Sequence, residues 1–249
     1  PVFHSGLSKV FEAYARFFIR RQVEDPGLRR RLTPDYTIGC KRVLVSSKWF
    51  PMFRRPNVEL VTAGIREVTQ NGIVTEDGVE RPVDCIILGT GFVTDPRIYM
   101  RDFPVTGLPG HALAQDWKEG AEAYYGISVS GHPNLYQLLG PNTGLGHNSV
   151  IFMIECQVHY ILECLRELKA RGDDALVVDP AAQATFNARV QKALAGTVWS
   201  SGCKSWYQSA DGRNFTIWPW STWRYWLATR KVHAKHYRFL RAAGQGRAR

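Results

Sequence analysis

Apolar positions recur at helical spacing in two long segments of the chain. Between residues 7 and 23 they fall every three or four positions, and the sequence Asp25-Pro26-Gly27 then stops the pattern. The same spacing runs from residue 151 to residue 168, and Gly172 marks its end. An alanine-rich run over residues 180–195 indicates a further helix. The pattern therefore predicts helices over these segments.

Between residues 57 and 92 the pattern changes to short alternating segments. Asn71-Gly72 and Asp77-Gly78 indicate hairpin turns, because these residue types tolerate positive φ. Residues 83–88 are nearly continuously apolar and end in Gly89-Thr90-Gly91, which is typical of a strand buried on both faces of a parallel sheet. Ligands in open α/β sheets lie at the carboxyl ends of such strands. We therefore expect a β-meander that leads into a buried strand and a candidate cofactor contact.

The segment LGPNTGLGHNSV, residues 139–150, connects a short apolar strand to the longest predicted helix. Its glycines indicate either a tight chain path or a backbone against which a ligand lies. Asn148 or Ser149 is placed to cap the helix, and a helix N-terminus stabilises an anion or a carbonyl oxygen brought against it. The segment matches neither G-x-G-x-x-G nor a phosphate loop, so its ligand need not be held through a diphosphate.

Composition describes a globular chain. Its 249 residues are 45% hydrophobic and 12% aromatic, which is ample for a core. The first residue is proline, which indicates a piece of a longer chain, and no run of about 18 apolar residues predicts a membrane span. Five cysteines without a C-x-x-C pair argue against a disulfide framework and a zinc site, and fit a cytoplasmic location. His233 and His236 lack a third ligand, so we expect a surface pair and no metal.

The net charge of +10 raises an anionic cofactor or nucleic acid as partner. Arginines cluster at residues 29–31 and in the C-terminal tail. The segment 199–238 is rich in tryptophan, tyrosine and arginine, which makes a nucleic-acid-binding module one alternative. Its aromatic residues lack the alternating stripe that a stacking platform needs, so we expect no nucleic acid.

Five segments together resemble the C-terminal half of a class B flavin-dependent monooxygenase, of the Baeyer–Villiger and N-hydroxylating branches. They are GCKR at 39–42, RPNVELV at 55–61, VDCIILGTGF at 83–92, HPNLYQLLGPNTGLGHNS at 132–149 and VWSSGCKSWYQSADGRNFTIWPWS at 198–221. The resemblance runs from Asp35 to Tyr237. The family's N-terminal glycine motifs for FAD and NADPH, and the fingerprint between them, do not occur in this sequence, so we expect a C-terminal fragment.

This resemblance implies an α/β fold, the C-terminal portion of a flavoprotein with two dinucleotide-binding domains. It would contain a short β-meander and parallel-type strands with helices. Residues 1–92 would be the remainder of the NAD(P)H-binding domain. Residues 93–249 would be the C-terminal part of the FAD-binding domain, with an aromatic-rich tail.

The resemblance also implies an enzyme that uses FAD, NADPH and O2. It would insert one oxygen atom into a ketone or an aldehyde, or oxidise a nitrogen or sulfur atom of a small organic substrate. The fragment is expected to be inactive alone. A non-oxygenating flavin-dependent NAD(P)H oxidoreductase is the other alternative, although the missing C-x-x-C pair disfavours a disulfide reductase.

Particular residues match functional positions of the family. Arg42 matches the active-site arginine, a role that suits a side chain that stays protonated. Lys41 matches the basic residue associated with the 2′-phosphate of NADPH, and Trp206 matches a tryptophan at the nicotinamide ribose and the substrate pocket. The predicted cofactor contacts are completed by a turn made of Gly89, Thr90, Gly91 and Phe92, and by a loop and helix start that include Pro141, Asn142, Gly146, His147, Asn148, Ser149 and Val150.

Overall fold

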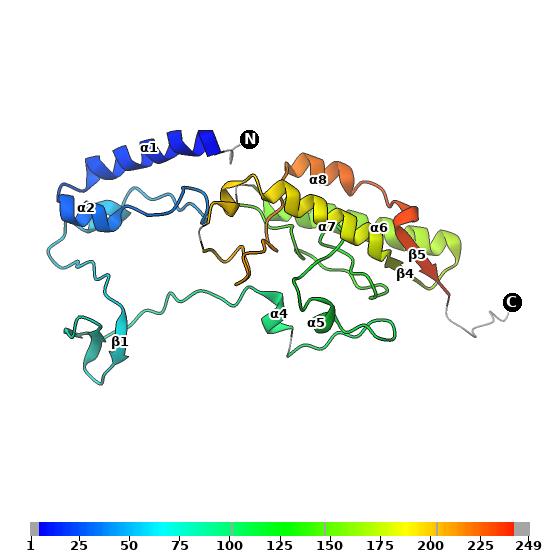
Figure 1. Cartoon of the computed structure of the whole chain (residues 1–249), viewed down its shortest axis with the longest axis horizontal. Coiled ribbons are helices and arrows are strands. Elements are labelled where there is room, and N and C mark those ends of the chain that lie inside the picture. The colour runs from blue at the N-terminus through cyan, green and yellow to red at the C-terminus, as the bar shows by residue number, and fades with distance from the viewer. Residues whose placement is uncertain (1–4, 101, 147, 203, 242–249) are drawn as a thin grey trace. The chain divides into compact units, whose positions relative to one another are not determined.

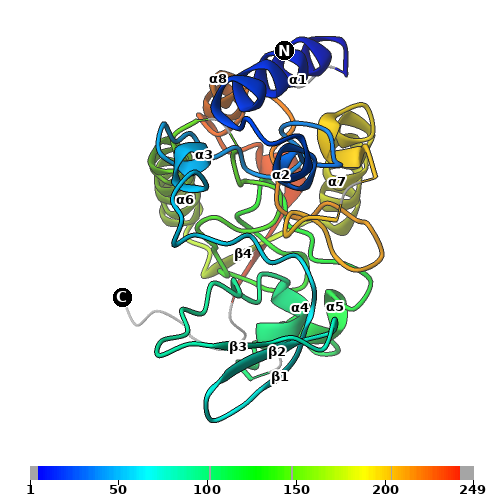
Figure 2. The ribbon, with the colours of Figure 1, turned by 90° about the vertical axis from the view of Figure 1, so that its left-hand side faces the viewer.

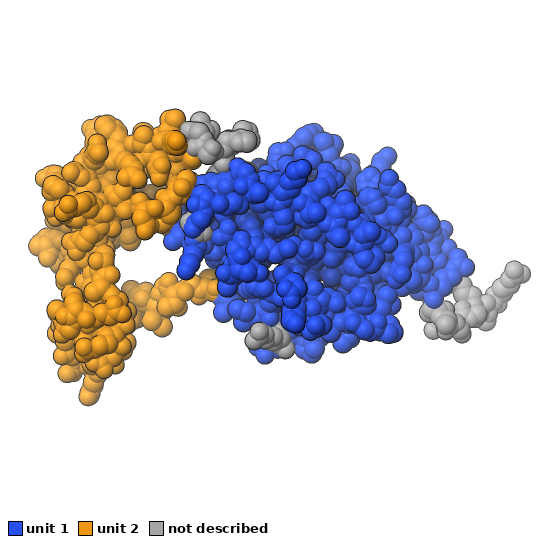
Figure 3. Space-filling model, in the orientation of Figure 1, with its two compact units in different colours: residues 1–5, 39–42, 93–249 blue, residues 6–38, 43–92 orange. Residues whose placement is uncertain are grey.

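The computed structural model describes residues 5–100, 102–146, 148–202 and 204–241. The chain divides into two compact units (Figure 3). The smaller unit comprises residues 6–38 and 43–92, and the larger unit comprises residues 1–5, 39–42 and 93–249. Residues 39–42 therefore belong to the larger unit, although the chain on either side of them belongs to the smaller one. The assignment of two cofactor-binding domains to this chain stays a prediction.

The helices of the smaller unit are α1 (Ser5–Gln22), α2 (Pro26–Leu32) and α3 (Trp49–Met52). The first confirms the helix predicted over residues 7–23. The predicted stop at Asp25 also starts α2, because its carboxylate accepts hydrogen bonds from the N–H groups of Gly27 and Leu28 at 2.9 and 3.0 Å. Figures 1 and 2 show α1 and α2 side by side.

The predicted β-meander is confirmed in the smaller unit. Its strands β1 (Ile65–Val68), β2 (Gly72–Thr75) and β3 (Glu80–Pro82) form one antiparallel sheet in that order. Asp77-Gly78 forms the turn between β2 and β3, and Gly78 has the positive φ of 80° expected of glycine in such a turn.

Residues 83–88, predicted to be a buried strand, form no strand in the structure. Their side chains are exposed, to 91% for Ile87 and 79% for Leu88. A strand exists only through hydrogen bonds to a neighbour, and within the described residues nothing pairs with the backbone of residues 84–92. Both described sheets are antiparallel, so the prediction of parallel-type strands is wrong for the described part of the chain.

The helix α6 (Val150–Arg171) runs through the larger unit and confirms the helix predicted over residues 151–168. Ser149 caps its start, because its hydroxyl accepts a hydrogen bond from the N–H of Phe152 at 3.3 Å. Gly172 ends it in the left-handed conformation, at a φ of 68°.

A second long helix and a two-stranded sheet complete the regular elements around the core of the larger unit. The helix α7 (Pro180–Leu194) confirms the prediction over residues 180–195. Strands β4 (Ala175–Val178) and β5 (Tyr237–Leu240) pair antiparallel. The remaining elements are α4 (Pro96–Tyr99), α5 (Leu113–Asp116), η1 (Val198–Ser200), α8 (Thr222–Ala228) and η2 (Ala234–His236).

Aromatic residues of the C-terminal segment form much of the core of the larger unit. Trp199, Tyr207, Trp218 and Tyr225 are each no more than 2% exposed. They belong to the segment 199–238 that suggested a nucleic-acid-binding module. Buried rings cannot stack on bases, so these four rings do not support that alternative, whereas Trp206 and Trp223 of the same segment are 48% and 60% exposed.

Three tyrosines of this core have hydrogen-bonded hydroxyl groups. The hydroxyls of Tyr160 and Tyr237 lie 3.1 Å apart, and the Tyr225 hydroxyl donates to the backbone carbonyl of Tyr125 at 2.6 Å. Burial raises the pKa of Tyr160, Tyr225 and Tyr237 well above the usual range of a phenol. These groups therefore stay neutral, and their hydrogen bonds satisfy polar atoms that the core shields from water.

The cysteines differ in state. Cys85, Cys156 and Cys164 are free thiols, and burial raises the pKa of Cys164 to about 12. Cys40 is buried and disulfide-bonded, a departure from the reduced state expected of the cysteines. Among the described residues no helix is long and apolar enough to cross a membrane.

Gly172 allows a test of how much the end of α6 depends on glycine. A Cβ atom at this position would meet no atom within 4 Å, so Gly172→Ala adds only the conformational cost of a left-handed alanine. We expect the free energy of unfolding to fall by about 1 kcal/mol in urea titrations. Gly196→Ala is the matched control, because its Cβ also meets nothing and its φ is not in the left-handed region. Equal losses in the two variants would contradict this account of the helix end.

Candidate functional site

A loop of the larger unit is hydrogen-bonded to a distant segment. Residues 142–144, which precede α6, pair with residues 214–218. The N–H groups of Asn142 and Gly144 each donate to a carbonyl of the second segment at 2.7 Å, and the N–H of Trp218 donates back to the Gly144 carbonyl at 2.9 Å. This pairing fixes the path of the loop within the protein itself.

Asn142 fastens the same loop through its side chain. It is 2% exposed and has a φ of 59°, a conformation that asparagine tolerates better than most residues. Its side-chain amide donates to the carbonyl oxygens of Asn214 at 2.9 Å and Ile217 at 3.1 Å. The amide donors of this predicted cofactor residue are therefore used inside the protein, and any contact with a cofactor would come from its backbone.

The glycines of the loop differ in the space that surrounds them. A Cβ on Gly140 would lie 2.4 Å from the carbonyl oxygen of Gly126, and one on Gly144 would lie 2.8 Å from that of Thr216. A Cβ on Gly146 would meet only ordinary contacts, the nearest being Trp199 at 3.6 Å. The tight path explains the first two glycines, whereas nothing in the described protein demands the third.

The start of α6 adds hydrogen-bond donors beside this loop. Asn148 accepts from the N–H of Ser149 at 2.7 Å and donates to the Thr222 hydroxyl at 3.0 Å, which holds the cap in place. Within the described residues, the N–H groups of Val150 and Ile151 have no acceptor. Pro141 is buried, and His147 lies outside the described residues. The helix start thus presents donors and a partial positive charge.

Tyr207 links this loop to Arg42. The Tyr207 hydroxyl lies 4.0 Å from the position of a Cβ on Gly146, and it has no hydrogen-bond partner among the described residues. Burial raises the pKa of the Tyr207 phenol, while the positive charge of Arg42 opposes that shift. Arg42, Gly146 and Tyr207 therefore lie in one region of the larger unit. They provide an exposed cation, a glycine with open space beside it and a buried phenol without a described partner. Tyr207 was not among the residues predicted from the sequence, although it stands next to Trp206 in the motif KSWYQ.

Trp206 and Lys41 flank this group of residues. Trp206 is 48% exposed, and its ring centroid lies 4.3 Å from that of Tyr207. Lys41 is exposed and precedes Arg42 in the larger unit. The predicted turn Gly89, Thr90, Gly91 and Phe92 belongs to the smaller unit, where it is exposed. The contacts of all these residues with a cofactor stay predictions.

Of the two histidines of the C-terminal segment, His233 is exposed and His236 contacts the core. The ring Nδ1 of His236 lies 2.7 Å from the Tyr124 hydroxyl, and burial lowers the pKa of this imidazole. His236 is thus partly buried rather than part of a surface pair. Among the described residues, no three histidine, cysteine, aspartate or glutamate side chains gather as metal ligands would.

Known proteins resemble this chain over nearly its whole length. It is 46% identical over 237 residues to a Baeyer–Villiger monooxygenase of Pseudomonas aeruginosa, covering 94% of this chain and 45% of that protein. It is 39% identical over 224 residues to an FAD-binding monooxygenase of Aspergillus niger, covering 88% of this chain and 36% of that protein. No protein-family model matches it.

Solved structures agree with the sequence comparison. The structure of an oxidized steroid monooxygenase bound to NADP is similar with a TM-score of 0.86 and 27% sequence identity. The match covers 97% of this chain and 47% of the other. The chain therefore spans less than half the length of the proteins that it resembles.

Asn142 provides a test of the loop's attachment. In Asn142→Asp a carboxylate faces two carbonyl oxygens, so we expect a loss of more than ~2 kcal/mol in the free energy of unfolding. The pKa of that new carboxyl would be raised in the folded state, so its protonation at low pH restores stability. The deficit should therefore be smaller at about pH 4 than at about pH 7.

Asn134→Asp is the matched control for this substitution. Asn134 has a similar φ of 55°, but it is exposed. Its side-chain oxygen accepts from the N–H of Leu176 and its amide donates to the carbonyl of Asp174, both at 3.1 Å. Aspartate keeps the acceptor and loses the donor, but water solvates its carboxylate at this exposed position. Denaturant titrations in which Asn134→Asp costs as much as Asn142→Asp would show that the buried donors of Asn142 are not decisive.

Proposed function

We propose that this chain, which corresponds to the C-terminal portion of the Baeyer–Villiger and FAD-binding monooxygenases, carries the flavin-ring side of an FAD- and NADPH-dependent oxygenation site. The reaction would insert one oxygen atom of O2 into a ketone or an aldehyde. The observation that carries the proposal is the grouping of Arg42 and Gly146 around the buried hydroxyl of Tyr207.

The residues of this group fit a flat, electron-rich ring. Gly146 leaves backbone open where a side chain would otherwise stand, and no packing contact of the described residues requires a glycine there. Tyr207 is a buried donor that awaits an acceptor, since its hydroxyl has no partner among the described residues. A carbonyl or ring nitrogen of a flavin would satisfy it.

Positive potential comes from two sources near the same place. Arg42 contributes the positive charge of its guanidinium, and the N-terminus of α6 adds about half a positive charge. When bound, FAD would be reduced by NADPH and would then react with O2. The reduced flavin ring would carry a negative charge. Arg42 and the helix start would stabilise that negative charge in place, without reorganising during the reaction.

The remaining predicted residues are proposed to orient NADPH and the substrate. Lys41 would meet the 2′-phosphate as a point charge. Trp206, half exposed beside Tyr207, would offer a flat apolar surface to the nicotinamide ribose and the substrate. The exposed turn at residues 89–92 would bring backbone to the cofactors.

A chimaera tests the proposed function. The C-terminal portion of the Pseudomonas aeruginosa relative would be replaced by this chain, which is 46% identical to it over 237 residues. We expect the chimaera to hold FAD and to convert a ketone to an ester while it consumes NADPH and O2. A folded chimaera that holds no FAD, or that consumes NADPH without forming ester, would refute the proposal.

Arg42→Ala in this chimaera should separate reduction from oxygenation. We expect NADPH to reduce the flavin at an unchanged rate, while ester formation falls by ~10²–10³ because a fixed charge is lost. NADPH would then be consumed with release of hydrogen peroxide. Arg166→Ala is the control, since Arg166 is exposed on α6 and pairs with Glu163. Equal ester yields in wild type and Arg42→Ala would remove Arg42 from the site.

Gly146→Ala should harm function without harming the fold. Its Cβ would lie 3.6 Å from the nearest atom, so the melting temperature of the 249-residue chain should not change. In the chimaera we expect reduced FAD content or slower turnover, because the methyl group occupies the ring's approach. Gly144→Ala, whose Cβ would lie 2.8 Å from a carbonyl oxygen, should instead cost ~1–3 kcal/mol of stability. A Gly146→Ala chimaera with unchanged FAD content and turnover would make Gly146 an ordinary loop residue.

A further inference from the structure

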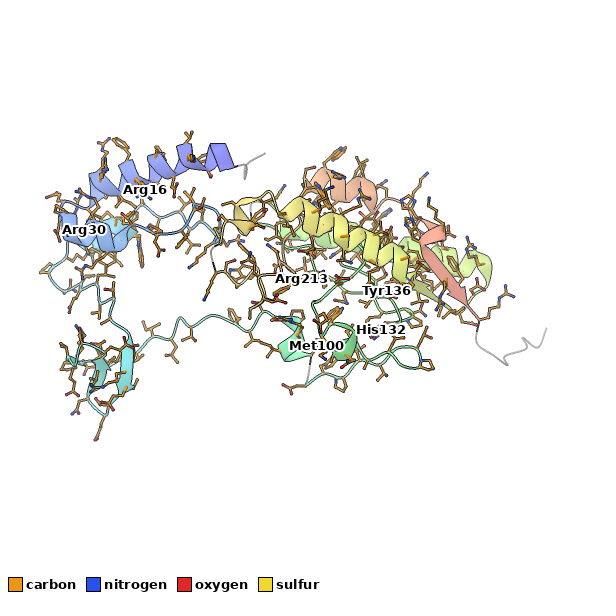
Figure 4. All side chains as sticks on the ribbon, viewed as in Figure 1. Arg16, Arg30, Met100, His132, Tyr136 and Arg213 are labelled. Carbon is orange, nitrogen blue, oxygen red and sulfur yellow. The ribbon has the colours of Figure 1, made fainter. Side chains whose placement is uncertain are left out.

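A pocket in the smaller unit is lined by arginines that the proposed oxygenation site does not use. It has a volume of about 410 Å³. Its charged lining consists of Arg16 and Arg20 from α1, Arg29 and Arg30 from α2, and Asp35 just beyond. Figure 4 labels Arg16 and Arg30 on these two helices.

The local fold explains how these side chains meet. Arg16 and Arg20 are one helical turn apart and therefore share a face of α1. Arg29 and Arg30 stand in the last turn of α2. The cap at Asp25 starts α2 immediately after α1 ends, which places the two helices side by side (Figures 1 and 2). The pocket is thus built from a continuous stretch of about twenty residues.

Carboxylates compensate little of this charge. Arg16 pairs with Glu12 at 3.9 Å, a long and exposed contact. Within the described residues, Arg20, Arg29 and Arg30 form no ion pair with a carboxylate. Attraction to helix C-termini accounts for an arginine in each last turn, but it does not account for Arg16 in the middle of α1. Guanidinium groups gathered in this way repel one another unless an anion lies between them.

We propose that this pocket binds a small anion that carries two or more phosphate groups. Guanidinium groups bind phosphate oxygens through paired, charge-assisted hydrogen bonds. The volume lies within the range of small-molecule sites. The described lining offers no aromatic ring and no long aliphatic side chain, so charge and not apolar contact selects the ligand. The site does not depend on the proposed oxygenation.

Pyrophosphate binding to the 249-residue chain tests the proposal, measured by calorimetry against sodium chloride of equal ionic strength. We expect saturable binding that Arg20→Gln weakens by about tenfold, the loss expected for one charged hydrogen-bond partner. Asp35→Asn should tighten it, because a negative charge leaves the pocket. Circular dichroism and unfolding midpoints would show that each variant keeps its fold.

Arg21→Gln is the matched control, since Arg21 is the next residue of α1, loses the same charge and does not line the pocket. It should change the affinity by no more than about twofold, the scale of a screened surface charge. The absence of saturable binding beyond the salt effect would overturn the proposal, and so would equal weakening by Arg20→Gln and Arg21→Gln.

A competition experiment distinguishes the source of the phosphates. If NADP displaces pyrophosphate and Arg20→Gln weakens both to the same extent, the ligand is a dinucleotide. If pyrophosphate binds and NADP does not compete, the ligand is a free phosphate-rich anion. Either result upholds the anion site.

Discussion

Backbone hydrogen bonds between residues 142–144 and 215–218 hold the candidate site of the larger unit together. They join segments about seventy residues apart in the chain, as does the Asn142 amide that donates to Asn214 and Ile217. Such distant pairing costs conformational entropy, which buried hydrogen bonds and the surrounding core must offset. Gly144 can have no side chain because this pairing brings the Thr216 carbonyl close to it.

This attachment determines what lies beside the free part of the loop. With residues 142–144 held in place, the next turn carries Gly146 to the neighbourhood of Trp199 and Tyr207. Tyr207 is buried whereas Arg42 is exposed, so water screens the electric field that the guanidinium exerts at the phenol. A flat ligand that displaced this water would lower the local dielectric constant. The same arginine would then act more strongly on the ligand than it acts on Tyr207 alone.

Features that depend on nearby residues were predictable from the sequence. The helix over residues 151–168 was predictable from the spacing of its apolar residues, its cap at Ser149 and its stop at Gly172. The structure confirms all three. The turn at Asp77-Gly78 is equally local. Residues 83–88 show the limit, because their apolar run describes a buried strand, yet a strand also needs hydrogen-bonding neighbours. Within the described residues those neighbours do not occur, and the segment lies exposed.

The candidate site was predictable in its parts but not in their roles. The sequence shows that the loop 139–150 is rich in glycine, but it cannot show which glycine faces a carbonyl oxygen and which faces open space. Only the three-dimensional path separates Gly140 and Gly144 from Gly146. Tyr207 escaped notice for a related reason, since a tyrosine in a motif full of aromatic residues gains significance only when its hydroxyl is seen to lack a partner.

Net charge and aromatic content are sums over the whole chain, and they do not show where the charged and aromatic residues lie in the fold. A net charge of +10 and abundant aromatic residues together suggested a surface for nucleic acid. The structure places Trp218 and Tyr225 in the core of the larger unit, whereas Arg16 and Arg30 line a pocket of the smaller unit. Stacking on bases requires accessible rings, and these two rings are buried. Charge therefore became informative only when it was assigned to a particular pocket, where three of the four arginines form no ion pair with a carboxylate of the described residues.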